Sequence, residues 1–216
     1  GSNNYAGWSV TGAGDVNNDG HADMLIGAYG ANSNAGRVYL IYGGDRDSLT
    51  SENLSSANVI FTGEAINDKL GYVVSAAGNY DNDVDGCDDF MMSATGNSGS
   101  AGKVYLFYGC QPRSGTVRVT SANVTFTGEA TGDTAGASLA AVNDLDNDGA
   151  DDILVGAPRN DDRASSAGKI YVIFGNTAST GLGSIGLSYT GETAGDYAGS
   201  SVTGGYDVNS DGNRDI

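Results

Sequence analysis

The sequence predicts an all-β protein assembled from four-stranded sheets. Three observations lead to this fold class: the 216-residue chain repeats itself, each repeat contains short segments rich in Val, Ile, Tyr and Phe, and glycine is abundant at 35 residues. Glycine at this level between apolar segments is typical of tight turns that join short strands. No segment shows the 3.6-residue apolar spacing of an amphipathic helix.

The repetition is clearest in a nine-residue acidic motif. Its copies are DVNNDGHAD at 15–23, DNDVDGCDD at 81–89, DLDNDGADD at 144–152 and DVNSDGNRD at 207–215, with first residues 66, 63 and 63 apart. The segments AGRVYLIYG, AGKVYLFYG and AGKIYVIFG recur in step, beginning at 35, 101 and 167. We therefore expect one repeat-built domain over 1–216, with repeats at approximately 5–66, 67–132 and 133–195 and a partial repeat at 196–216.

Each complete repeat is expected to contain four strands, which in the first copy are WSVTG, DMLIGA, RVYLIYG and NVIFTG. The second and third are apolar on both faces, so both faces of each sheet should be covered. The fourth alternates, with Val59 and Phe61 on one side, which suits an outer strand half exposed to water. Four-stranded units covered by their neighbours describe the blades of a β-propeller, and a β-sandwich is the alternative.

The charge of the chain limits its partners. Asp and Glu number 27 against 10 Lys and Arg, which gives a formal net charge of −17. Such a surface repels nucleic acid and anionic membranes, so neither is expected as a partner. No run of about 18 apolar residues is present, and membrane insertion is not expected.

The acidic motif joins the first strand of each repeat to the second and fits a calcium-binding loop. Ca²⁺ takes about six to eight oxygen ligands. Side chains at positions 1, 3 and 5 would supply three, the main-chain carbonyl at position 7 a fourth, and a bidentate aspartate at position 9 two more. Glycine at position 6 permits the sharp turn around the ion.

The side chains expected to bind the metal are Asp15, Asn17, Asp19, Asp23, Asp81, Asp83, Asp85, Asp89, Asp144, Asp146, Asp148, Asp152, Asp207, Asn209, Asp211 and Asp215. The expected carbonyl donors are His21, Cys87, Ala150 and Asn213. An EF-hand would need a glutamate at position 12 and flanking helices, but this position falls inside an expected strand. A single acidic loop could be a solvated turn, whereas four in phase predict about four Ca²⁺, one per loop.

The repeat pattern G-x-S-V…D-x-N-x-D-G-x-x-D-x-L-x-G-A-P…G-x-V-Y resembles FG-GAP repeats, the blades of the integrin α-subunit propeller and of many bacterial surface and secreted proteins. The naming Phe-Gly is replaced by Ala6-Gly7, Leu70-Gly71, Ala135-Gly136 and Ala198-Gly199, and Gly-Ala-Pro is intact only at 156–158. The resemblance implies a calcium-stiffened propeller used for extracellular adhesion or recognition. The departures leave integrin-type ligand specificity unsupported.

Three repeats are complete, whereas the fourth stops at Ile216, directly after its last expected ligand. Propellers close with about 4–8 blades. We therefore interpret the chain as a fragment of a larger propeller, and completion of the ring by a second chain is the alternative.

No enzyme activity is expected. His21 is the single histidine and lies in an acidic loop, which nearly excludes His-based catalytic triads and His-rich metal sites. Glu64, Glu129 and Glu192 recur at one position of the repeat, and an aspartate follows each four residues later. These carboxylates form either a functional ring or a repeated turn device that bonds backbone amides, and the second interpretation is favoured.

Two features break the repeat. The loop PRNDDRASS at 158–166 is longer and more charged than its counterparts. Arg159 and Arg163 within it are candidates for binding an acidic partner or a sugar carboxylate, and a solvated insertion is the alternative. Cys87 and Cys110 lie in loops at the same end of the second repeat, so a disulfide and two free thiols both stay open. A disulfide would fit an oxidising compartment.

Two classes of function follow. The first is a secreted or cell-surface module that recognises an extracellular protein or glycan. The second is a calcium-stabilised carbohydrate-binding or accessory domain of a secreted enzyme. Antiparallel strands place the acidic loops at one end of the sheets and loops 29–35, 95–101 and 158–167 at the other. The ligand surface is expected at the second end, because its loops vary on a rigid scaffold.

Overall fold

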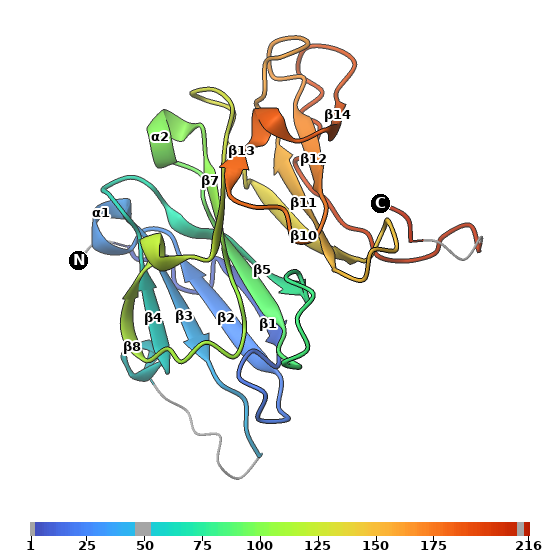
Figure 1. Ribbon diagram of the computed structural model, residues 1–216. Coiled ribbons are helices and arrows are strands. Elements are labelled where there is room, and N and C mark those ends of the chain that lie inside the picture. The colour runs from blue at the N-terminus through green and yellow to red at the C-terminus, as the bar shows by residue number, and fades with distance from the viewer. Residues whose placement is uncertain (1–2, 46–52, 211–213) are drawn as a thin grey trace.

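The computed structural model describes residues 3–45, 53–210 and 214–216 and contains three β-sheets that follow one another along the chain (Figure 1). The first sheet contains β1 (Ser9–Gly14), β2 (Asp23–Ala28), β3 (Arg37–Ile41) and β4 (Val59–Thr62). The second contains β5 (Leu70–Gly78), β6 (Asp89–Ala94), β7 (Lys103–Phe107) and β9 (Val124–Thr127). The third contains β10 (Ser138–Asn143), β11 (Asp152–Ala157), β12 (Lys169–Ile173) and β14 (Leu187–Thr190). Neighbours among these strands pair antiparallel, and the predicted all-β class is confirmed.

The helical segments are single turns. α1 (Ala31–Asn34) and α2 (Asn97–Ser100) lie between the second and third strands of the first two sheets, and each contains residues with positive φ, such as Asn32 at 52°. The 3₁₀ turns η1 (Leu54–Ser56), η2 (Val119–Ser121) and η3 (Leu182–Ser184) precede the fourth strands. No helix among the described residues has the length and apolar composition needed to cross a membrane.

The fourth strand is not the outer edge of the first two sheets, contrary to expectation. β8 (Gly115–Arg118) pairs parallel with β4, and β13 (Thr180–Gly181) pairs parallel with β9. Each added strand comes from the following repeat and supplies partners for backbone groups that would otherwise form an open edge. The expected alternation across the faces holds, since Val59 and Phe61 are fully buried and Ile60 between them is partly exposed.

Consecutive sheets bury their apolar faces against each other. Leu25, Leu40 and Phe61 of the first sheet form one cluster with Phe90 and Phe107 of the second. The ring centroids of Phe61 and Phe107 are 4.7 Å apart. The other face of the second sheet packs in the same way against the third. Covering of the second sheet on both faces explains why β6 is buried at every position. β11 is buried in the same way, because its other face packs against residues that include Leu145 and Val202.

The Ala-Gly that recurs before each third strand is explained by the approach of the next sheet. Gly102 has a φ of +90°, and a Cβ there would lie 2.6 Å from the amide nitrogen of Ala135 and closer still to its carbonyl oxygen. Gly36 and Gly168 meet the same obstacle from the backbones of Leu70 and Ala198. Only glycine satisfies both the backbone conformation and the close contact.

Replacing Gly102 by alanine should therefore destabilise the protein by about 2–5 kcal/mol, because the strain of positive φ adds to an overlap with the backbone of Ala135. Gly132→Ala is the matched control, since Gly132 has a φ of +100° and nothing within 4 Å of a built Cβ. That control should lose only about 1–2 kcal/mol. Urea unfolding measures both variants, and equal losses would contradict the role of the close approach.

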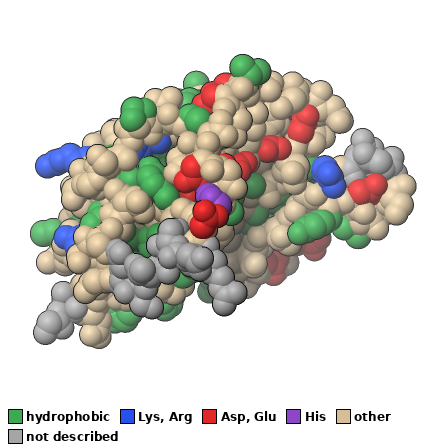
Figure 2. All heavy atoms as spheres, turned by 90° about the horizontal axis from the view of Figure 1, so that it is seen from below, with side chains coloured by type: hydrophobic (Ala, Val, Ile, Leu, Met, Phe, Trp, Pro, Cys, Tyr) green, Lys and Arg blue, Asp and Glu red, His purple; other side chains and the backbone are tan. Residues whose placement is uncertain are grey.

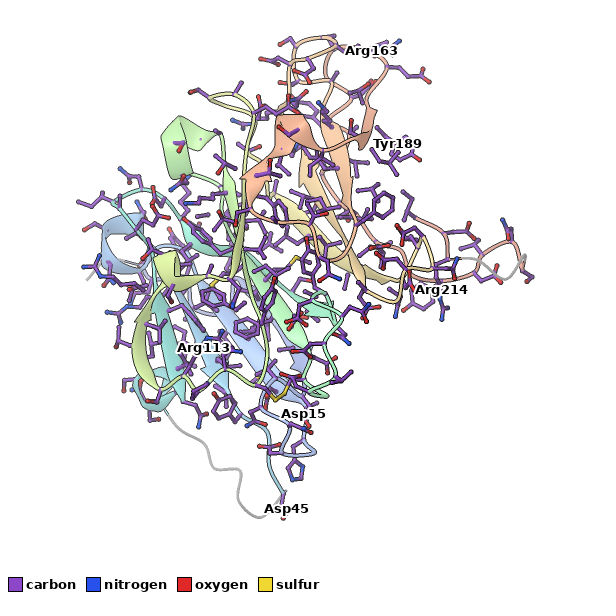
Figure 3. All side chains as sticks on the ribbon, in the orientation of Figure 1. Asp15, Asp45, Arg113, Arg163, Tyr189 and Arg214 are labelled. Carbon is purple, nitrogen blue, oxygen red and sulfur yellow. A yellow bond between two sulfur atoms is a disulfide. The ribbon has the colours of Figure 1, made fainter. Side chains whose placement is uncertain are left out.

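The two kinds of loop lie at opposite ends of the sheets, as the strand alternation predicted. Figure 3 shows Asp15, in an acidic loop, at one end of the molecule and Arg163 at the other. At the acidic end, Cys87 and Cys110 form a disulfide with their Cα atoms 5.7 Å apart. Of the two alternatives left open by the sequence, the disulfide is confirmed. It fastens the second acidic loop to the segment that follows β7.

Candidate metal centre

Each of the first three acidic loops leaves its first strand through a β-bulge. The pairing register shifts at the end of β1, β5 and β10, and the residue after each shift has a positive φ: 79° at Gly14, 64° at Gly78 and 57° at Asn143. Glycine and asparagine tolerate this conformation. The bulge bends the chain so that the following residues curl over the end of the sheet. Seen from this end, acidic side chains gather around the single histidine, His21 (Figure 2).

In the third loop, the side chains at positions 1 and 3 point at the same backbone amide. The Asp148 amide donates to Asp144 Oδ1 at 3.1 Å and to Asp146 Oδ1 at 3.2 Å. The amide at position 5 of the first loop donates to Asp15 Oδ1 and Asn17 Oδ1 in the same way, at 3.1 and 3.0 Å. Two oxygens that share one donor lie close together. The curl of the loop therefore brings the predicted ligands at positions 1 and 3 close together.

The third loop also brings the far end of the motif into this group. Ligand oxygens of Asp144, Asp146 and Asp152 all lie within 4.8 Å of one another. Burial raises the pKa of the Asp152 carboxyl, amide hydrogen bonds from Leu145 and Gly175 oppose the rise, and the charges of Asp146 and Asp144 add to it. Three carboxylates this close repel one another. The group has the composition and the electrostatics of a cation site.

The aspartate at position 9 is buried in all three complete repeats. Asp23, Asp89 and Asp152 are 2%, 1% and 0% exposed. Asp152 Oδ2 accepts a hydrogen bond from the Leu145 amide at 2.7 Å, and Oδ1 accepts one from the Gly175 amide at 2.8 Å. A carboxylate oxygen has room for about two partners, so these bonds are compatible with a metal bond. The carboxylate ties the loop entry to the segment after the third strand.

The same pair of hydrogen bonds recurs in the first and second repeats. Asp23 Oδ2 and Oδ1 accept from the amides of Val16 and Gly43, at 2.9 and 2.7 Å. Asp89 accepts from the corresponding amides at 2.9 and 2.8 Å. Burial raises the pKa of the Asp89 carboxyl to about 7 and that of Asp23 above its usual range. A nearby cation would favour the charged form of each.

The second loop contains a candidate ligand that the sequence comparison missed. Eleven positions separate Gly78 from Asp89, against nine between the corresponding residues of the first and third loops. Counted from the bulge, Asn79 stands where Asp15 and Asp144 stand. Among the described residues, the buried Asn79 Oδ1 has no hydrogen-bond partner. An orphaned buried oxygen at a ligand position fits a bond to a cation.

The predicted ligands of this loop follow one another along its rim. Asp81 Oδ1 and Asp83 Oδ1 each accept the amide two residues on, at 3.3 and 3.1 Å. Asp85 Oδ1 accepts the Cys87 amide at 2.9 Å. Burial raises the pKa of Asp81, and the charges of Asp83 and Asp85 add to the rise. The sequence contained a signal for the longer second loop: the first two copies of the acidic motif start 66 residues apart, whereas the later copies start 63 apart.

Position 7 carries His21, Cys87 and Ala150, whose amides each donate to the position-5 carboxylate at 2.9, 2.9 and 2.8 Å. Their carbonyls stay predicted ligands. Cys87 offers no thiolate, because its sulfur is bonded to Cys110. In the fourth loop one of the two corresponding hydrogen bonds is described, since Asp215 Oδ2 accepts the Val208 amide at 2.7 Å. Of the remaining predicted ligands there, Asp207 and Asn209 are described, whereas Asp211 and Asn213 lie outside the described residues.

Position 8 of the motif, for which no role was predicted, joins successive loops. Asp88 Oδ2 accepts the Asp15 amide at 2.8 Å, and the Asp88 amide donates to the Asp15 carbonyl at 3.0 Å. Asp151 forms the same reciprocal pair with Asn79, at 2.8 and 3.0 Å. These bonds could not be predicted from the motif, because they link different repeats. Through them, position 1 of the first and second candidate sites is held by the next loop.

The repeated glutamates lie at the opposite end and do not act as expected. Glu64 Oε1 accepts hydrogen bonds from Lys103 Nζ at 2.8 Å and from the Tyr105 hydroxyl at 2.7 Å, and Glu129 makes the same contacts with the equivalent lysine and tyrosine. The favoured interpretation, bonds to backbone amides, is wrong for Glu64 and Glu129. It is correct for the aspartate four residues later, since Asp68 Oδ2 accepts the Ala65 amide at 3.0 Å.

The structure does not bring the two candidate arginines into one pocket. Arg159 lines a hollow of about 380 Å³ at the end opposite the acidic loops. Arg163 is not among the residues that line it, and its Nε donates to the Glu192 carbonyl at 3.1 Å. The loop that carries them is also held by the first turn of the same repeat, because the Asn160 amide group donates to Asp133 Oδ2 at 2.9 Å.

Comparison with known proteins agrees with this architecture. The family model described as FG-GAP repeat matches residues 6–41 and 135–173. Each matched segment spans the first three strands of a sheet together with its acidic loop.

Similar curated proteins include phosphatidylinositol-glycan-specific phospholipase D of Mus musculus, 33% identical over 161 residues that cover 70% of this chain and 18% of that protein. Integrin alpha-5 of Xenopus laevis is 30% identical over 162 residues, covering 71% of this chain and 14% of the integrin. The human phospholipase D is 31% identical over 163 residues, 70% of this chain and 18% of the enzyme. The chain thus spans less than a fifth of the length of these relatives. By its repeats, its loop geometry and these matches, the chain belongs to the FG-GAP repeat family of integrin-like β-propellers.

Proposed function

We propose that the chain is a calcium-binding segment of an extracellular β-propeller that serves recognition or adhesion. The observation that carries this proposal is the convergence of Asp144, Asp146 and Asp152 within 4.8 Å. All the candidate donors are oxygens, the ligands that hard cations such as Ca²⁺ prefer. The orphaned Asn79 Oδ1 adds a second, independent sign of a cation in the neighbouring loop.

About four ions are proposed, one for each loop, held by the side chains and carbonyls predicted from the sequence, with Asn79 added in the second loop. The ion would neutralise carboxylates that otherwise repel one another. The chain's own residues do the positioning: the bulge curls each loop, the position-9 carboxylate closes it, and Asp88 and Asp151 fasten it to its neighbour. Calcium would then stiffen one whole end of the molecule.

The proposed location is outside the cell. The Cys87–Cys110 disulfide favours an oxidising compartment, and a strongly acidic surface suits a soluble secreted or surface-held protein. The partner would be an extracellular protein or glycan, bound at the end that carries residues 29–35, 95–101 and 158–167, with Arg159 and Arg163 among the candidates. The remaining blades would come from a longer chain or from a second chain.

A second candidate function is an accessory domain of a secreted enzyme. The match to relatives named as phospholipases D over only 18% of their length favours it, because a module of that size can serve an enzyme without carrying its catalytic residues. No catalytic role is proposed for this chain. Both functions require the same calcium-bound scaffold and differ in what the opposite end binds.

Isothermal titration of EDTA-treated protein with CaCl₂ should give about four sites, with oxygen-only ligands of the kind Ca²⁺ takes. Asp146→Ala should remove one site, because it deletes one of the three converging carboxylates. Glu192→Gln, which removes an exposed carboxylate at the opposite end, is the control and should leave the stoichiometry unchanged. Binding of one ion or none would contradict the proposal.

Calcium should also raise the stability of the fold. Sites on extracellular modules often have a Kd near 10⁻⁴–10⁻³ M, and at tenfold excess each intact site adds about 1.4 kcal/mol. Three intact sites would add about 4 kcal/mol, which is comparable with the net stability of many domains. Thermal unfolding with CaCl₂ and with EDTA measures the effect. A melting temperature that is the same in both would argue against calcium as a structural ligand.

A further inference from the structure

The first turn of every repeat has the same backbone but different side chains. In each, a residue with positive φ accepts at its carbonyl a hydrogen bond from the amide three residues later, at 3.1–3.2 Å. The pairs, in chain order, are Tyr5 and Trp8, Lys69 and Tyr72, Thr134 and Ala137, and Tyr197 and Ser200. The turn thus holds two side chains per repeat in the same backbone geometry, and these two residues differ from one repeat to the next.

The turns of the second, third and fourth repeats converge on the hollow of about 380 Å³ at the end opposite the acidic loops. Lys69, Tyr72, Thr134 and Ser200 line it, together with Arg159 from the longer loop of the third sheet. Residues from three repeats therefore share one wall. The volume falls in the range of small-ligand sites, roughly 300–1,000 Å³.

The charge of the hollow is opposite to that of the protein. Two of the ten basic residues, Lys69 and Arg159, line it, and no Asp or Glu does, in a chain with 27 acidic residues. Neither basic side chain forms an ion pair with any described residue. Lys103 and Lys169, by contrast, are paired with carboxylates. The hollow therefore offers two unneutralised cations, which favours an anionic ligand.

An aromatic cluster continues from the hollow. Tyr72 lies 5.6 Å from Tyr29 and 5.8 Å from Trp8, measured between ring centroids, and Tyr5 stacks on Tyr29 at 5.0 Å. Trp8 and Tyr5 are 54% and 47% exposed despite these contacts. A group of large rings half open to water is typical of an interaction site, and the flat faces of the rings suit the apolar face of a sugar ring.

Hydroxyl groups complete the lining. Thr95, Ser100 and Thr134 border the hollow, and within the described part of the chain their hydroxyls make no hydrogen bond. A hydroxyl can donate one bond and accept two, which matches the alternating donors and acceptors of a saccharide.

We propose that this hollow and the adjoining aromatic cluster bind an acidic saccharide, with the carboxylate held by Lys69 and Arg159 and a neighbouring sugar ring lying on Trp8 and Tyr72. An acidic peptide would satisfy the cations but would leave the exposed rings and the unused hydroxyls without matching groups, so the saccharide is favoured. The inference rests on the proposed recognition function and names the ligand class of its variable end.

The test uses the calcium-loaded chain and two acidic probes, sialyllactose and a tetrasaccharide of hexuronic acid, with lactose as the neutral comparison. At least one acidic probe should bind, and lactose should bind at least roughly tenfold more weakly because it lacks the carboxylate. Lys69→Ala combined with Arg159→Ala should weaken acidic-probe binding by roughly tenfold or more, and Trp8→Ala should also weaken it. Arg118→Ala removes an exposed charge from β8 and should change nothing.

Melting curves check that every variant stays folded and still gains stability from calcium. If calcium stabilises the chain but neither acidic probe binds, the saccharide inference is wrong and the metal proposal stands. Equal binding of lactose, or binding that survives loss of Lys69 and Arg159, would also overturn the inference. So would preferential binding of an aspartate-rich hexapeptide. If calcium does not stabilise the chain, the proposed function itself fails, whatever the probes show.

Discussion

Each sheet depends on one buried carboxylate. The second strand of each sheet begins with a buried aspartate: Asp23, Asp89 or Asp152. Its carboxylate accepts one hydrogen bond from a backbone amide at the entry of the acidic loop and one from an amide in the segment after the third strand. Without it, two buried amides would lose their acceptors, at a cost of about 1–3 kcal/mol each. The same carboxylate is a predicted metal ligand, so the group that closes the hairpin is also the one a cation would bind.

The two ends of the molecule differ in how their loops are held and in how much their residues vary between repeats. At the acidic end, successive loops are fastened by reciprocal bonds such as those between Asp88 and Asp15, and the second loop is further held by a disulfide. At the other end, ion pairs such as Lys103–Glu64 fix the frame, at 2.8 Å, while the residues on the first turns change from repeat to repeat. A stiff, repetitive end and a variable end on one scaffold suit a recognition module.

Local sequence was sufficient for the strands and for the type of site. Strand segments are defined by residues within a few positions of one another, and the alternation of Val59 and Phe61 with polar or half-exposed neighbours predicted their burial. The acidic loops likewise show their donors over nine consecutive residues. Glycine at 20, 86 and 149 marked the turns, and all three have the positive φ that such turns require.

The sequence by itself determined the all-β class, the four strands of each repeat and the oxygen-rich loops, because each of these depends on contacts between near neighbours. Only the tertiary structure decided that β8 and β13 cover the neighbouring edge, that Glu64 bonds to a lysine and a tyrosine, and that Lys69 and Arg159 face one hollow. Those features join residues from different repeats. Their positions follow from how one sheet packs on the next, which no single repeat encodes.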